Sequence, residues 1–301
     1  MAERLIRIIM GDVLFGLKNA FYLGSYSTAV AEASTLSSEL APHSPEALEM
    51  NVLMYRAAIA SGTPEMALEE IDSSAPSALQ AVRLYARYMR GEAEAALEEL
   101  VALAADPSCA GNATVQLMCA SAHAAEGNVA EALRCCHAGS GGGAQGLELQ
   151  ALAAQLLLGM DRVELAERQV RSMSEVDDDA TLTQLATAWV SLAQGGAKVQ
   201  EASYIFQELG EKFNVTVTLM NGTAACMMRM GRYDDAEKEL LEALAKDAKN
   251  PETLANLFVC ALHNGKPPAR YMNQLKMVAP THPIVAKAAD LDAQFEAIVN
   301  A

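Results

Sequence analysis

The sequence has few aromatic and few basic residues. Phe, Trp and Tyr make up 5% of the chain, and Lys plus Arg number 22 against 38 Asp plus Glu, a formal net charge of −16. Such an acidic surface repels phosphate backbones and anionic lipid headgroups. Lys and Arg are also scattered singly rather than gathered in runs. We therefore predict no nucleic-acid binding and no direct membrane binding.

Secretory and membrane-spanning segments are also missing. The apolar stretch near the start is too short for a signal-peptide core and is soon interrupted by Asp12 and Lys18. We expect neither a secretory signal nor a transmembrane span. The six cysteines form no C-x-x-C pair and no evenly spaced framework. Free thiols in a reducing compartment are therefore expected.

Recognisable catalytic, cofactor and metal motifs are absent as well. The glycine-rich run 139–143 lacks the strand and the Gly-Lys-Ser/Thr of a phosphate-binding loop, and there is no Gly-x-Ser-x-Gly elbow. Cys135, Cys136 and His137 are adjacent, so they point in different directions on a helix, and no second ligand pair has usable spacing. We predict no catalytic residue, no cofactor and no metal site. An enzyme assembled from scattered residues is the alternative, but no pairing of nucleophile and base supports it.

The sequence does contain a repeated motif, Gly-x-x-x-x-Ala, between two amphipathic segments. The residue at the glycine position of each copy is its marker. The markers recur every 29 to 38 residues, close to the tetratricopeptide period of about 34. Two copies are blurred, with Asp161 before Ala166 and Ala197 before Ala202, and the last copy has Arg270 in place of the alanine. The markers are Gly24, Gly62, Gly91, Gly127, Asp161, Ala197, Gly231 and Gly265.

The repeat predicts an all-α fold in which about eight tetratricopeptide-like helix pairs stack as an α-α superhelix. Glycine allows the left-handed conformation that ends the first helix, and alanine lets the second helix approach closely. Ser44-Pro45 and Asn250-Pro251 mark helix starts. We predict a single solenoid domain over 1–301, with 1–11 poorly ordered and 139–146 a glycine-rich loop between repeats.

The first helices of such a stack line a concave groove. Residues about three, six and ten positions before each turn are expected to face it, and their apolar, aromatic and neutral polar character suits a surface that grips a polypeptide. Burial between repeats is the alternative for each of them. The predicted groove residues are Leu14, Lys18, Phe21, Val52, Arg56, Ile59, Ala81, Tyr85, Tyr88, Gln184, Thr187, Ser191, Asn221 and Met228.

The amino-acid sequences of several repeats, and not only their period, resemble those of one protein family. The segments appear in the family's order from near residue 12 to near residue 275, so the resemblance extends over most of the chain. They are 17–26 (LKNAFYLGSY), 73–83 (SSAPSALQAVR), 178–196 (DDATLTQLATAWVSLAQGG), 204–208 (YIFQE), 221–226 (NGTAAC), 251–257 (PETLANL) and 265–268 (GKPP). On these segments the sequence resembles the epsilon subunit of coatomer, the COPI vesicle coat.

The resemblance implies a non-catalytic subunit of a cytosolic coat that assembles on Golgi membranes and coated vesicles, in Golgi-to-ER retrograde and intra-Golgi transport. The implied partner is the C-terminal domain of the coatomer alpha subunit, and other coatomer subunits and the membrane are reached through the assembled coat. The alternative is another tetratricopeptide adaptor or cochaperone that binds a peptide tail. The weakly cationic groove counts against the carboxylate clamp of that subclass.

Overall fold

The computed structural model describes residues 12–139 and 146–299. Residues 1–11, predicted to be poorly ordered, lie outside the described residues. So do residues 140–145, most of the segment predicted as a loop. Of that segment, Gly139 is the last residue of one helix and Gly146 directly precedes the next.

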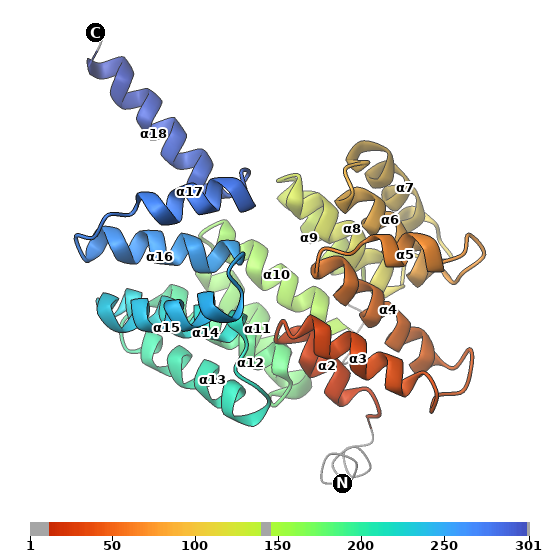
Figure 1. Ribbon diagram of the computed structural model, residues 1–301. Coiled ribbons are helices and arrows are strands. Elements are labelled where there is room, and N and C mark those ends of the chain that lie inside the picture. Colours follow the sequence, from red (N-terminus) through yellow and green to blue (C-terminus); the bar gives the residue numbers. More distant parts are fainter. Residues whose placement is uncertain (1–11, 140–145, 300–301) are drawn as a thin grey trace. The chain divides into compact units, whose positions relative to one another are not determined.

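Every regular element in the described residues is an α-helix, which confirms the all-α prediction (Figure 1). Eight pairs follow one another, each with a short internal turn, and one more helix comes last. The pairs are α2 (Phe15–Tyr22) with α3 (Tyr26–Leu36), α4 (Pro45–Ala60) with α5 (Glu65–Glu70), α6 (Ser77–Met89) with α7 (Ala93–Ala105), α8 (Ala113–Ala125) with α9 (Val129–Gly139), α10 (Leu147–Gly159) with α11 (Val163–Asp177), α12 (Thr181–Gln194) with α13 (Lys198–Lys212), α14 (Val217–Arg229) with α15 (Tyr233–Lys246), and α16 (Pro251–His263) with α17 (Ala269–Val278), and the last helix is α18 (Pro283–Val299).

Two compact units divide the chain, residues 1–193 (unit 1) and 194–301 (unit 2). Unit 1 holds α2 to α11 and all of α12 except its last residue, and unit 2 holds α13 to α18. The single continuous domain over 1–301 stays a prediction. Among the helices of the described residues, none is both long enough and apolar enough to cross a membrane.

The turn inside each pair contains a residue in the left-handed conformation. At Gly231 the amide N–H donates to the carbonyl of Met228 at 3.0 Å, and Arg232 N–H donates to Met227 at 2.9 Å. These two bonds satisfy carbonyls that the end of α14 would otherwise leave free. The positive-φ residues of the eight turns are Gly24, Gly62, Gly91, Gly127, Asp161, Gly195 with Gly196, Gly231 and Gly265.

The two blurred repeats have different outcomes. Asp161 has φ +59° and, with Arg162, makes the same pair of backbone bonds, so the prediction there is correct. The marker placed at Ala197 is wrong. Gly195 and Gly196 have φ of +79° and +59°, whereas Ala197 has φ −65° and directly precedes α13. This turn contains two left-handed residues where the other turns contain one, so the Gly-x-x-x-x-Ala spacing does not apply to it.

Small residues after the turns allow close packing, as predicted. Seven alanines at this position have no exposed surface, and in the eighth pair the position is held by the exposed Arg270. There, Met272 and Leu275 supply the buried contacts of α17 instead. The seven buried alanines are Ala29, Ala67, Ala96, Ala132, Ala166, Ala202 and Ala236.

Both predicted helix starts are capped by side chains. The Ser44 hydroxyl accepts a hydrogen bond from Ala47 N–H at 3.1 Å, and the side-chain Oδ1 of Asn250 accepts one from Thr253 N–H at 3.0 Å. A proline follows each cap, where the missing N–H costs nothing. These caps satisfy amide groups that the first turn of a helix leaves without a partner.

The stacked pairs of unit 1 curve until the first meets the fifth and sixth. The Tyr22 hydroxyl on α2 donates to Glu148 on α10 at 2.8 Å, and the Thr181 hydroxyl on α12 donates to the side-chain oxygen of Asn19 on α2. The two pairs of residues are 126 and 162 positions apart in the sequence. Unit 1 therefore brings its first helix back against helices that are distant along the chain.

Unit 2 has its own apolar clusters and a polar link between repeats. Leu240 and Leu257 pack with neighbours on α14 to α16. The Asn221 amide on α14 donates to the Thr253 hydroxyl on α16 at 2.8 Å. The last helix, α18, has Val285 as its buried residue, and the side chain of Phe295 near its end is exposed. The core of unit 2 therefore thins towards the end of the chain.

Candidate functional site

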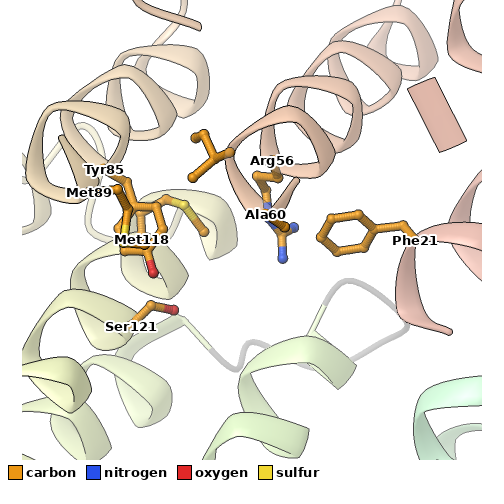
Figure 2. A pocket seen from close by; sticks show the side chains of 8 residues that line it. Phe21, Arg56, Ala60, Tyr85, Met89, Met118 and Ser121 are labelled. Carbon is orange, nitrogen blue, oxygen red and sulfur yellow. The ribbon is translucent and has the colours of Figure 1, made fainter. Parts of the chain in front are cut away.

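First helices of the first four pairs surround a pocket of about 240 Å³ in unit 1 (Figure 2). Four of its lining residues are predicted groove residues: Phe21 on α2, Arg56 and Ile59 on α4, and Tyr85 on α6. Their side chains converge because each stands three or six positions before the turn of its repeat. The spacing therefore brings side chains from three repeats together at one pocket, and their contact with a partner stays a prediction. The remaining lining residues are Ala60, Met89, Met118 and Ser121.

The charge of Arg56 is neutralised at the pocket wall. Its Nη2 lies 2.5 Å from Oε2 of Glu148, and the two side chains are 13% and 19% exposed. The guanidinium carbon also lies 4.7 Å from the centre of the Phe21 ring, a cation–π contact. Glu148 accepts a second hydrogen bond from the Tyr22 hydroxyl. The cation is therefore held directly by two side chains from two other helices, and Tyr22 holds the Glu148 carboxylate in place.

Burial and pairing have opposite effects on the pKa values of this pair. Burial alone raises the pKa of Glu148, but the charge and hydrogen bond of Arg56, together with the Tyr22 hydrogen bond and the charge of Lys18, lower that pKa below its ordinary value. Burial likewise lowers the pKa of Arg56, but Glu148, with smaller contributions from Tyr22 and Tyr85, raises that pKa above its ordinary value. Burial, followed by the charge of Glu148, raises the pKa of the Tyr22 hydroxyl well above its ordinary value. The pair stays ionised at neutral pH, so neither group serves as a proton donor or acceptor.

Two tyrosines supply the aromatic character of α6. The rings of Tyr85 and Tyr88 are stacked, with centroids 5.9 Å apart and an angle of 15° between their planes. The Tyr88 hydroxyl donates to Glu126 Oε1 at 2.6 Å. Burial raises the pKa of Tyr85, and burial together with Glu126 raises the pKa of Tyr88 to about 12. Both side chains are half-buried and neutral, which suits contact with a partner's apolar surface.

The other predicted cation, Lys18, is also paired. Its Nζ lies 3.1 Å from Asp12 and 3.0 Å from Glu49. Burial lowers the pKa of Lys18, but the hydrogen bonds that its ammonium group donates to Glu49 and Asp12, with the negative charges of both carboxylates, raise it overall. A clamp for a peptide carboxylate needs cations that can still accept an anion. Lys18 and Arg56 each have a carboxylate partner within unit 1 instead.

Five predicted groove residues are buried in the core. Leu14, Val52, Ala81 and Ser191 are at most 6% exposed, and none of them lines the pocket. Ile59 is equally buried and forms part of the pocket wall. Burial between repeats, the alternative given for each position, therefore describes these four. The surface available to a partner is smaller than the spacing rule predicts.

The remaining predicted residues are not among those that line the pocket. On α12, Gln184 Nε2 donates to the carbonyl of Asp178, and the Thr187 hydroxyl donates to that of Thr183, each at 2.8 Å. Asn221 and Met228 belong to unit 2, where Met228 packs against the cluster of α14 to α16. Trp189 on α12 is half-buried against the cluster of α10 to α12.

Sequence reasoning did not identify four pocket residues. Ser121 is six positions before Gly127, so the same rule applied to the fourth repeat would have found it. Ala60 and Met89 lie two positions before their turns, and Met118 lies nine before its own. These three line the pocket from positions outside the three-, six- and ten-residue spacing, so the sequence pattern did not single them out.

Comparisons with known proteins agree with the architecture. A family model described as coatomer epsilon subunit matches residues 10–301. Coatomer subunit epsilon-1 of Arabidopsis thaliana is 44% identical over 95% of both chains. Coatomer subunit epsilon of Dictyostelium discoideum is 31% identical over 95% of this chain and 97% of its own.

A solved structure resembles the fold. A tetratricopeptide repeat protein from Parabacteroides merdae aligns with a TM-score of 0.60 over 87% of this chain and 96% of its own, at 14% identity. This likeness confirms the tetratricopeptide-like fold. The sequence relatives are coat subunits, which confirms the prediction that the chain is not an enzyme. The match over nearly the whole length shows that the chain belongs to the coatomer epsilon subunit family.

Proposed function

We propose that this chain is a structural subunit of the COPI coat that binds the C-terminal domain of the coatomer alpha subunit. It supports coat stability in Golgi-to-ER retrograde and intra-Golgi transport. The observation that carries the proposal is family membership over residues 10–301. The proposed location is the cytoplasm, peripheral on Golgi membranes and coated vesicles. A net charge of −16 agrees with membrane contact through the assembled coat rather than directly.

The proposed contact surface is the pocket formed by α2, α4, α6 and α8 together with Tyr88. Its lining is mostly apolar and aromatic, the composition of the central part of protein interfaces. Tyr85 offers an aromatic ring and a hydroxyl, and rigid aromatic side chains in pockets commonly dominate binding energy. A hydrophobic side chain or a short helix of the partner fits this surface better than a charged tail does.

A cochaperone-like function is less well supported. A peptide tail ends in a carboxylate, which needs unpaired Lys or Arg in the groove. Lys18 and Arg56 are each bound to carboxylates at 3.1 Å or less. A tail would have to displace those partners before it could bind.

Replacing Tyr85 and Tyr88 with Ala tests the proposed surface. Each anchor is expected to contribute about 2 kcal/mol, so each single change should weaken binding to the alpha-subunit domain about 30-fold. Titration calorimetry with purified proteins measures the affinity, and far-UV circular dichroism checks that helicity is unchanged. Tyr204→Ala is the matched control and should leave the affinity unchanged, because Tyr204 is 60% exposed on α13, the second helix of its pair, and does not line the pocket. Unchanged affinity in both variants would show that the partner binds elsewhere.

A separate experiment tests the coat function. The purified wild-type chain serves as bait in cytosol, and retained proteins are identified by mass spectrometry. Recovery of the alpha subunit with other coatomer subunits is expected. Recovery of chaperones without coatomer subunits would contradict the coat function, whatever the tyrosine variants show.

A further inference from the structure

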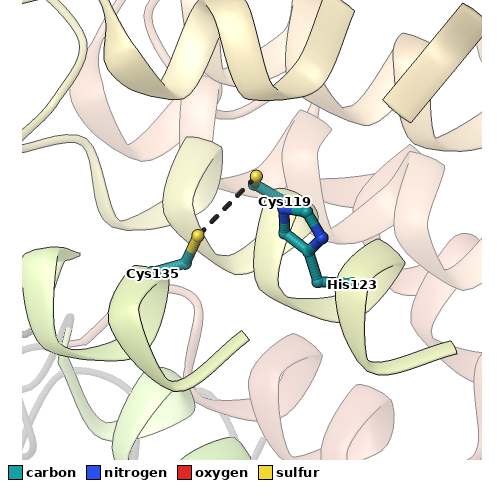
Figure 3. Close-up of side chains that lie close together, drawn as sticks. All are labelled: Cys119, His123 and Cys135. Atoms are coloured by element: carbon teal, nitrogen blue, oxygen red, sulfur yellow. Dashed lines mark hydrogen bonds between the residues drawn. The ribbon is translucent and has the colours of Figure 1, made fainter. Parts of the chain in front are cut away.

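Three soft ligand atoms converge inside the fourth helix pair. The sulfur atoms of Cys119 and Cys135 and a ring nitrogen of His123 all lie within 4.8 Å of one another (Figure 3). Cys119 and His123 are four residues apart on α8, so they share one face of that helix. Cys135 reaches them from α9. The spacing of these residues in the sequence does not reveal the group, because Cys135 joins the other two only through the packing of α9 against α8.

The separation of the two sulfur atoms suits a metal ion better than a disulfide. Cys135 Sγ donates to Cys119 Sγ at 3.7 Å, and all six cysteines of the chain are free. Two Zn–S bonds of about 2.3 Å at a tetrahedral angle separate their sulfurs by about 3.8 Å. A disulfide requires about 2.05 Å. The thiols therefore already stand at the spacing of a zinc site.

His123 has a donor or acceptor without a partner. Its Nδ1 is buried and makes no hydrogen bond within the described residues. A buried polar atom without a partner is unfavourable, and a ring nitrogen of the same imidazole lies within 4.8 Å of both sulfurs. Thiolate sulfur and imidazole nitrogen are the ligands that Zn²⁺ takes in proteins. Glu131, one turn before Cys135 on α9, adds negative charge nearby, although its carboxylate is paired with Arg134 at 2.5 Å.

We propose that Cys119, His123 and Cys135 bind one Zn²⁺ ion between α8 and α9, with water in the fourth position. On binding, each thiol releases its proton to solvent, and the two thiolates balance the charge of the ion. His123 and Cys135 are half-buried, so water reaches the open position. The ion links α8, which carries Met118 and Ser121 of the pocket, to the second helix of its own pair.

Zinc affinity of the full chain tests the proposal. The reduced protein is titrated with Zn²⁺ in competition with a chromogenic chelator, and with Co²⁺ as a spectroscopic probe. We expect one Zn²⁺ per chain, a thiolate-to-cobalt charge-transfer band, and a rise in melting temperature with Zn²⁺. Loss of a group that supports a ligand typically costs 10–100-fold in affinity, so Cys135→Ala and His123→Ala should each cost about 100-fold or more. Cys226→Ala, a buried cysteine in unit 2, is the matched control and should keep wild-type affinity.

Two outcomes would overturn the proposal. One is Zn²⁺ binding that neither Cys135→Ala nor His123→Ala weakens, which would assign it to other groups. The other is no stoichiometric binding by the reduced chain, with Cys119 and Cys135 forming a disulfide in air. His123→Ala keeps the test valid if a cysteine variant fails to fold, because His123 is half-buried at the end of α8.

Discussion

Replacing Glu148 with Gln removes the charge that faces Arg56 and nearly preserves the side-chain volume. The two side chains are 19% and 13% exposed, so water can replace little of the lost interaction. Breaking a buried ion pair on one side costs about 3–5 kcal/mol. Because some water reaches both groups, we expect the lower end, a loss of about 3 kcal/mol in the free energy of unfolding of unit 1.

Urea unfolding followed by tryptophan fluorescence measures this loss. Trp189 is the single tryptophan and packs against the cluster that includes α10, the helix that carries Glu148. Glu167→Gln is the matched control: its pair with Arg171 spans 3.3 Å on the surface of α11. Exposed pairs of this kind contribute about 0.5 kcal/mol or less.

A double-mutant cycle separates the pair from its surroundings. Arg56→Met, Glu148→Gln and the double variant should give a coupling energy of about 2 kcal/mol, since the residues touch directly. The double variant should be more stable than Glu148→Gln alone, because it leaves no unpaired buried guanidinium. If Glu148→Gln is no more destabilising than Glu167→Gln, Arg56 does not depend on this carboxylate, and the explanation of the pocket's neutrality is wrong.

Three further predictions concern acid, packing and turns. Burial alone raises the pKa of Glu148, but Arg56 and its neighbours hold that pKa below the ordinary value of 4.5. The ionised carboxylate therefore stabilises unit 1 above pH 4.5, and this stabilisation is lost as the pH falls through the lowered pKa. In acid titrations, the free energy of unfolding should fall less steeply with pH for Glu148→Gln than for the wild type. Gly222→Ala places Cβ 2.8 Å from the Phe206 ring and should cost unit 2 about 1–3 kcal/mol in urea unfolding followed by circular dichroism. Asp161→Gly should stabilise unit 1 by up to about 1 kcal/mol, because glycine adopts φ +59° without strain; a loss in the same assay would show that the Asp161 side chain stabilises the turn.

The sequence predicts the local structure well because each repeat is determined by nearby residues. A left-handed residue at Gly231 and a small one at Ala236 define a helix pair without reference to the rest of the chain. Prediction failed at Ala197, because the two preceding residues, Gly195 and Gly196, both take the left-handed conformation and end the turn before Ala197. The blurred marker at Asp161 succeeded because aspartate tolerates the left-handed conformation.

The groove is predicted less well because it depends on curvature. A small rotation between neighbouring pairs accumulates over several repeats, and no single repeat determines where the first helix meets the fifth pair. Arg56 is identifiable from its position before Gly62, but its partner Glu148 lies 92 residues later and has no signal of its own. With a free Arg56 the same groove would suit an anionic tail, whereas with a paired Arg56 it suits an apolar partner. The binding preference that we propose for this surface therefore rests on a contact that only the three-dimensional structure reveals.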